Sequence, residues 1–205
     1  GEKDLVGLPP FVIDAARAAG SEKDAGGPVV TLSRSLIVPF MQFSTRRDLR
    51  EVAYKAWAAR GANGGNTDNR AIASEILGLR QERARLLGYD SFADYKLETE
   101  MAKSSDAVRD LLMAVWAPAK ARAEADAKAL EEMMRADGVN GPLEPWDWRF
   151  YSERRRKMLH DLDEAELKPY FQLDRMIEAA FDCATRLFGL AFKQLDVPLY
   201  HEDCR

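Results

Sequence analysis

Histidine and cysteine are scarce in this chain of 205 residues, which contains two of each. Cys183 and Cys204 are too few for a disulfide framework, so a reducing cytoplasm is the compartment we expect. His160 and His201 lie far apart in the sequence, whereas an HExxH zinc site needs two imidazoles four residues apart on one helix. We therefore expect no metal ligand set in this chain and no bound cofactor.

Long apolar runs are also absent, and no stretch approaches the length that a membrane-spanning helix requires. Acidic residues number 34 and basic residues 30, which leaves a net charge of −4. A mildly acidic chain has no general attraction for nucleic acid or for anionic membranes, so neither is expected as a partner. The first residue is Gly1 and no signal-peptide pattern follows it, which fits either a segment from the interior of a longer protein or a residue left by a tag.

What the sequence does contain is helical periodicity, because apolar residues recur every three or four positions between capping residues and glycine stops. The expected helices cover approximately residues 9–20, 45–60, 67–87, 91–102, 105–138, 146–160, 163–167 and 174–188. Pro118 is expected to kink or interrupt the long helix that begins at Ser105. Val29 to Leu32 are short and β-branched, the pattern of a strand. The predicted fold is therefore mainly α, a multi-helix scaffold with one or two short strands.

We treat residues 1–205 as one helical portion, with a sub-boundary near 138–145, where a loop with glycine and proline separates two helices. Residues 201–205, His-Glu-Asp-Cys-Arg, begin like HExxH. The fifth position is Arg205, whose guanidinium stays cationic and does not ligate zinc. No catalytic residue and no metal ligand is therefore assigned.

The most aromatic stretch is Pro-Trp-Asp-Trp-Arg-Phe-Tyr at 145–151. One interpretation is packing, in which Trp146 is buried and Asp147 caps or orients the helix that carries Tyr151. The alternative is that Asp147 and Tyr151 line a groove. Packing is favoured because aromatic clusters usually belong to cores, and both side chains are kept as candidates for a substrate channel.

Several of these segments resemble, in order and without large gaps, motifs of the thimet oligopeptidase and peptidyl-dipeptidase family of HExxH zinc metallopeptidases. The similar segments are residues 29–44 with Pro-Phe-Met, 46–57, 66–89, 92–102 and 145–153 with Pro-Trp-Asp. The chain departs from the family pattern at three places. Arg46 stands where Asn is common, Glu100 replaces a Lys, and Phe150 replaces the first of two Tyr.

The resemblance implies that the parent protein is a two-lobed, largely helical channel peptidase that uses zinc to hydrolyse short peptides. In such proteins HExxH, a further Glu ligand and the main substrate-binding residues follow the stretch that this chain resembles. The chain would then be a catalytically inactive part of the scaffold and channel wall, and its partners would be peptide substrates and the missing zinc-bearing half. The alternative is a free-standing helical protein-interaction module. Peptide specificity and oligomeric state are not indicated.

Overall fold

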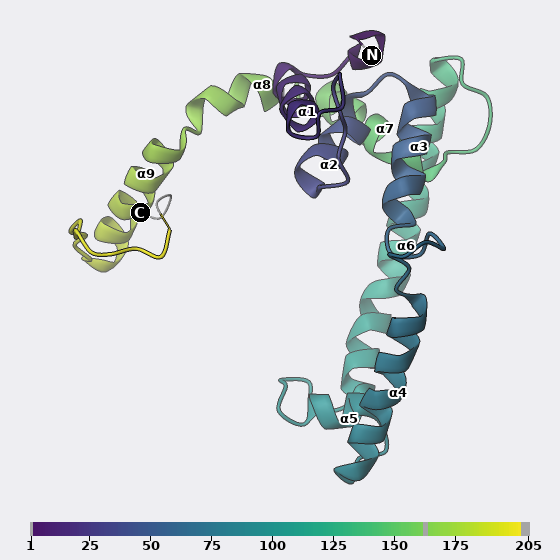
Figure 1. Cartoon of the computed structure of the whole chain (residues 1–205), viewed down its shortest axis with the longest axis vertical. Helices are drawn as coiled ribbons and strands as arrows, with labels where there is room; N and C mark the ends of the chain where they lie inside the picture. The colour runs from purple at the N-terminus through teal and green to yellow at the C-terminus, as the bar shows by residue number, and fades with distance from the viewer. Residues whose placement is uncertain (1, 162–163, 202–205) are drawn as a thin grey trace. The chain divides into compact units, whose positions relative to one another are not determined.

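The computed structural model describes residues 2–161 and 164–201, and it is mainly helical, as predicted (Figure 1). Contacts divide the chain into two compact units, Gly1–His160 and Asp161–Arg205. The first unit contains η1 Glu2–Leu5, α1 Pro10–Glu22, α2 Arg34–Phe43, α3 Arg47–Ala58, α4 Arg70–Leu86, α5 Phe92–Leu97, α6 Ser105–Ala136 and α7 Pro145–His160. The second contains α8 Glu164–Leu167, η2 Lys168–Tyr170 and α9 Leu173–Phe188. The expected sub-boundary at 138–145 falls inside the first unit.

One hydrophobic core of the first unit forms between its N-terminal helices. Leu5, Leu8 and Val12 pack against the α2 residues Leu36 and Phe40. The apolar residues of α2 are spaced for one buried face, so this helix can contact α1, α3 and α7 at the same time.

The predicted strand at Val29 to Leu32 is wrong, because these residues are irregular and no strand occurs in the described ranges. The backbone N–H of Val29 donates to the carbonyl of Ala16 at 2.9 Å, and Val30 packs against the first core. A β-branched segment needs a neighbouring strand to form a sheet. Here its hydrogen bond and its apolar contacts go to helix α1 and the first core instead.

A second core joins the C-terminal part of α6 to α7. Leu130 and Met134 of α6 are buried against Tyr151 of α7. Two ion pairs reinforce the contact, one between Arg154 and Asp137 and the other, at 3.2 Å, between Arg155 and Asp126. This core places the aromatic 145–151 segment inside the first unit.

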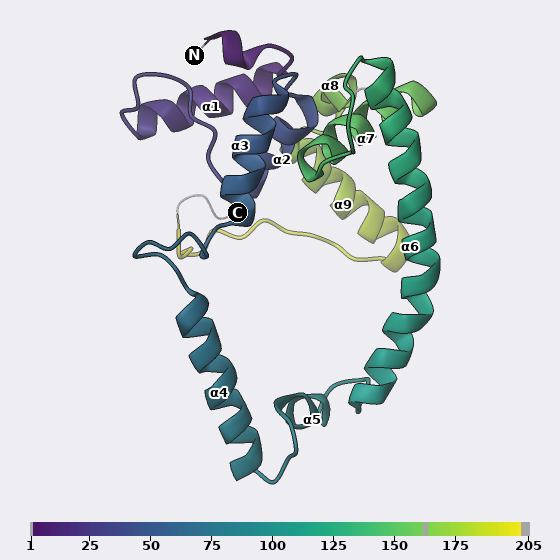
Figure 2. The same ribbon diagram turned by 90° about the vertical axis from the view of Figure 1, so that its right-hand side faces the viewer.

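Helix α6 is continuous from Ser105 to Ala136, so the interruption expected at Pro118 does not occur. Figure 2 shows α6 as a single bowed helix. Proline removes one backbone donor, but the other hydrogen bonds of a 32-residue helix can keep the helix continuous at that position.

Two helix ends follow the signals that the sequence offers. The Ser91 hydroxyl accepts a hydrogen bond from the Asp94 N–H at 3.1 Å and starts α5, as predicted. Helix α5 nevertheless ends at Leu97, earlier than the predicted 102, and turns follow it. Gly189 closes α9 in the left-handed conformation, with φ 66°, as its position after the last apolar residue predicted.

None of the helices in the described part of the chain is long and apolar enough to cross a membrane. Helix α1 runs two residues beyond its predicted stop at Gly20. Helix α8 is one turn that ends at Leu167, as expected, and the 3-10 helix η2 follows it; position 163, the expected first residue, lies outside the described residues.

Candidate functional site

The chemically most unusual feature of the first unit is a buried carboxylate between two arginines. The Asp147 side chain is 0% exposed. Its Oδ2 accepts from Arg47 Nη2 at 2.7 Å, and its Oδ1 accepts from Arg47 Nε at 2.9 Å and from Arg50 Nη2 at 3.0 Å. A buried carboxylate is tolerated only when its oxygens are paired and hydrogen-bonded in this way.

Arg50 is buried with it and connects three parts of the unit. Its Nη1 donates to the Ser44 carbonyl at the end of α2, at 2.7 Å, and its Nε donates to the Trp146 carbonyl at 3.0 Å. The guanidinium also lies over the Phe150 ring, 4.2 Å from its centre. Because one planar group satisfies all these acceptors, Arg50 fixes α2, α3 and α7 relative to one another.

Asp147 also caps its own helix, as predicted. It is the third residue of α7, and its Oδ2 accepts the backbone N–H of Glu144 at 3.3 Å, just before the helix begins. This is the reciprocal half of a capping box, in which a side chain in the first turn binds back to the residue before the helix. The negative charge also faces the positive end of the helix dipole.

The charges of this cluster follow from its burial. Burial alone would raise the pKa of the Asp147 carboxyl, but hydrogen bonds from Arg47 and Arg50 outweigh it and hold the pKa below its usual value. Burial lowers the pKa of the Arg50 guanidinium, against the opposing pull of Asp147. Arginine remains a cation at neutral pH despite such a shift. The cluster is therefore a permanent ion triad at neutral pH.

The other residues of the 145–151 segment separate into interior and surface positions. Tyr151 is 3% exposed and belongs to the second core, where burial raises the pKa of its phenol. Trp146, predicted to be buried, is half-buried; its Nε1 is enclosed without a hydrogen-bond partner, and Tyr54 and Lys55 lie against its ring. Asp147 and Tyr151 thus support the packing of this unit, and their role as substrate-channel residues remains a prediction.

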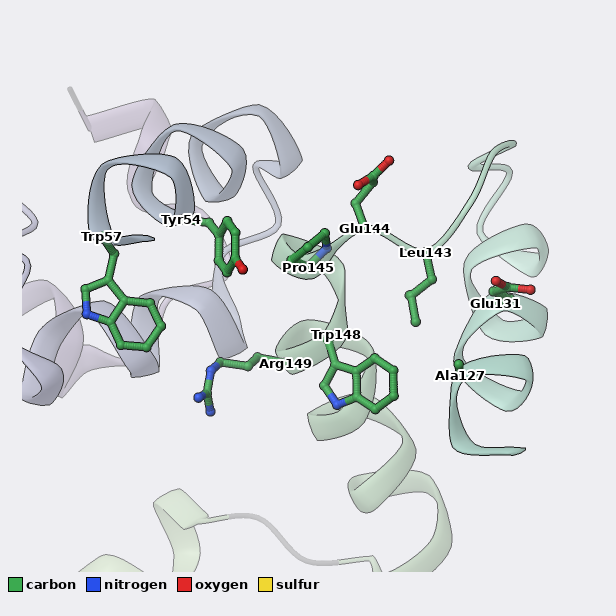
Figure 3. A pocket seen from close by; sticks show the side chains of 9 residues that line it. All are labelled: Tyr54, Trp57, Ala127, Glu131, Leu143, Glu144, Pro145, Trp148 and Arg149. Carbon is green, nitrogen blue, oxygen red and sulfur yellow. The ribbon is translucent and has the colours of Figure 1, made fainter. Parts of the chain in front are cut away.

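An open groove lies beside this cluster, between α3, α6 and α7 (Figure 3). It encloses about 570 Å³ and is lined by Tyr54, Trp57, Ala127, Glu131, Leu143, Glu144, Pro145, Trp148 and Arg149. Figure 3 shows Arg149 on the side of Trp57 and the two glutamates on the side of Leu143. Asp147 and Tyr151 are buried and are not among its lining residues, so the sequence candidates do not line this groove.

Within the described residues, no group of three His, Cys, Asp or Glu side chains could hold a metal ion. His201 lies at the end of the described chain, and the remainder of the HExxH-like segment, residues 202–205, lies outside the described residues. The described side chains therefore do not fit a zinc site.

Arg47 and Arg50 were not singled out from the sequence, although they complete the buried cluster. They lie three residues apart and so share one face of α3, which is the local signal for a joint partner. The carboxylate that they share is 97 to 100 residues away along the chain. No local pattern indicates a pairing over that distance.

The side chains at the three positions that depart from the family pattern each contact another side chain in the structure. Arg46 pairs with Asp4 at 2.5 Å and with Asp48 at 2.7 Å, and Glu100 pairs with Lys96. Phe150 serves as the platform beneath Arg50. These substitutions are therefore accommodated by the structure.

Comparison with known proteins places these segments in one family. A family model described as peptidase family M3 matches residues 40–205. Oligopeptidase A of Escherichia coli is 32% identical over all of this chain and 31% of its own length. A probable cytosolic oligopeptidase A of Arabidopsis thaliana is 37% identical, over all of the chain and 30% of its own length.

The dipeptidyl carboxypeptidase of Escherichia coli is 31% identical over 98% of this chain and 30% of its own length. The chain therefore spans just under a third of the relatives it matches. Since the family model covers most of the sequence and the motif order agrees with it, the chain belongs to peptidase family M3.

Proposed function

We propose that the complete protein is a zinc-dependent peptidase that hydrolyses short peptides, and that this chain forms part of its helical framework. The observation that carries the proposal is the similarity to oligopeptidase A along the whole of this chain. The chain spans only 31% of that relative, so most of the protein's length, including the zinc ligands, would lie elsewhere in the polypeptide. The isolated chain would then be inactive.

Zinc, when bound by that other part, would supply Lewis-acid activation of water and of the peptide carbonyl. The contribution of this chain is mechanical. The Asp147 triad fixes the relative positions of α3 and α7, which form the walls of the groove in Figure 3. Such walls can hold the residues of a substrate channel in fixed positions only if their helices are rigidly joined.

Asp147 and Tyr151 remain our candidates for the channel, through an indirect role. Both side chains are buried within this unit, so they would act by holding the residues that face a peptide. Direct contact with substrate would require them to become exposed in the complete protein. The two-lobed architecture of that protein is likewise part of this proposal.

The relatives that match this chain include proteins named oligopeptidase A and proteins named dipeptidyl carboxypeptidase. The proposed substrate class is therefore short peptides, without a choice between internal cleavage and removal of C-terminal dipeptides. One relative is named a probable cytosolic enzyme. Together with the low cysteine content, this supports the cytoplasm as the proposed compartment.

The test uses a short quenched fluorescent peptide with a free C-terminus. The longer gene product is expected to cleave it, to lose activity to a chelator, and to regain activity when zinc is added. The 205-residue chain, assayed at the same concentration with added zinc, is expected to show no turnover. Chelator-resistant cleavage by the longer product would contradict the proposed chemistry, and zinc-dependent turnover by the repurified 205-residue chain would contradict the proposed division of labour.

A further inference from the structure

One face of α6 carries an apolar row along most of the helix, and only one end of that row is covered. The row, which we call the α6 seam, repeats every three or four residues and so stays on one side of the helix. Its members are Leu112, Trp116, Ala119, Ala123, Ala127, Leu130 and Met134.

The C-terminal end of the α6 seam is part of the second core. Met134 is 0% exposed and Leu130 is 1% exposed, because Tyr151 of α7 packs against both. Ala127 is partly exposed and lines the groove beside α7. The cover supplied by α7 therefore ends within the α6 seam.

The N-terminal end has the same pattern but lies open to solvent. Trp116 is 61% exposed and Leu112 is 62% exposed, and every residue from 109 to 125 is exposed. Figures 1 and 2 together show that α4 does not lie along this part of α6, since the two helices overlap in one view and stand apart in the other. Leu111 and Val115, which flank the row, are equally uncovered.

Such a surface is costly in water. Four large side chains within two helical turns form a continuous apolar patch, and patches of this kind usually mark interfaces. The opposite face of α6 is different in character, with Asp110, Ala121 and Lys128. The contrast between the two faces predicts a partner on one side of the helix only.

We infer that an apolar helix packs against the uncovered half of the α6 seam. This helix would belong to the same polypeptide but to a part of it outside these 205 residues. The inference rests on the proposed function only in taking this chain as a segment of a longer peptidase. The α6 seam continues an interface already filled by α7, so a second helix would extend the same core. The chain spans about 31% of the relatives' length, so ample polypeptide remains to supply that helix.

The small residues in the middle of the α6 seam also fit a helix as the occupant. Ala119 and Ala123 lie between the large side chains at the open end and those in the second core. Small side chains let two helix axes approach closely, toward the lower end of the usual 8–10 Å range. Trp116 and Leu112 would then pack against the same helix at the N-terminal end of the α6 seam.

The test measures solvent access at single cysteines in the longer gene product. In a background carrying Cys183→Ser and Cys204→Ser, we compare Leu112→Cys and Trp116→Cys with Ala121→Cys, which lies on the opposite face of α6. Alkylation is followed by peptide-level mass spectrometry, and each rate is divided by its rate in denaturant. We expect Leu112→Cys and Trp116→Cys to react at least about tenfold more slowly than Ala121→Cys.

Equal normalised rates at the three positions would overturn the inference. Protection that grows with protein concentration would also overturn it, because the occupant would then be a second copy of the chain. The two Cys positions make the result independent of either variant failing to fold. Labelling does not require zinc or turnover, so the outcome is separate from the peptidase assay.

Discussion

At the scale of single residues, Asp147 joins α7 to α3 in the first unit. It closes the start of α7, pairs with Arg47, and neutralises the buried charge of Arg50. The energetic consequence is asymmetric, because removing one member of a buried ion group leaves another charge without compensation.

Replacing Asp147 by Asn keeps its volume but removes its charge. We expect Asp147→Asn to lower the unfolding free energy of this chain by about 3–5 kcal/mol, since Arg50 is left buried without a counterion. The measurement is urea unfolding followed by circular dichroism. The matched control is Asp48→Asn, an exposed carboxylate that pairs with Arg46, for which we expect little change. Similar losses in the two variants would contradict the importance of burial.

The same carboxylate gives a pH dependence with a definite sign. The pKa of Asp147 is lower in the folded state than its unfolded value of about 3.9. Its contribution to stability is therefore complete above about pH 4 and is lost as pH falls through the folded pKa.

We expect the stability difference between the parent chain and Asp147→Asn to be constant near neutral pH and to shrink in acid below about pH 4. Asp48 and Asp68, whose pKa values are also lowered, to about 2, titrate in both proteins and cancel in the difference. Denaturant midpoints measured from pH 7 down to about pH 3 test this. A difference that does not change in acid would mean that Asp147 does not carry the effect.

At the scale of elements, Gly20 marks where α1 meets other backbone. Gly20 lies inside α1, and a Cβ placed there would be 2.0 Å from the carbonyl oxygen of Gly27. The loop after α1 can fold back onto the helix only because this position lacks a side chain. The sequence interpretation of Gly20 as a helix stop was wrong for this reason.

We expect Gly20→Ala to destabilise the chain by about 1–3 kcal/mol, because the loop must move away from α1. The control is Gly78→Ala, also in a helix interior, where nothing lies within 4 Å of the new Cβ. That variant should be stabilised by about 0.5–1 kcal/mol through a higher helix propensity. Thermal unfolding of both variants checks the prediction, and stabilisation by Gly20→Ala would exclude the close contact.

At the scale of the whole molecule, several apolar surfaces of the described residues are exposed within their own unit. Besides the α6 seam, α4 exposes an apolar row, and α9 in the second unit has no buried residue. The exposed side chains of the α4 row are Ile72, Ile76, Leu79 and Leu86, and Leu87 directly after the helix is exposed as well. A complete globular protein would normally cover such surfaces, which agrees with a chain that spans a third of its relatives.

We expect the isolated 205-residue chain to retain no stoichiometric zinc after dialysis. The described side chains offer no ligand group, and the position that completes HExxH is occupied by Arg205. Elemental analysis of the dialysed chain tests this, with the longer gene product as the positive control. One tightly bound zinc per chain that disappears in His201→Ala would contradict it.

The sequence by itself determined most of the helices, several of their ends and the family. Caps such as Ser91 and stops such as Gly189 act within a few residues, so their effect can be predicted from local chemistry. The order of the family motifs is a property of the sequence as well. These features needed no knowledge of how the helices pack.

The tertiary structure alone decided what Val29, Gly20 and Asp147 contact. Val29 binds the backbone of α1 instead of a strand, and Gly20 meets a loop seven residues away. Asp147 finds Arg47 and Arg50 about a hundred residues earlier in the chain. Local propensity cannot specify such partners, because they depend on which apolar faces become buried together and therefore on the packing of the whole unit.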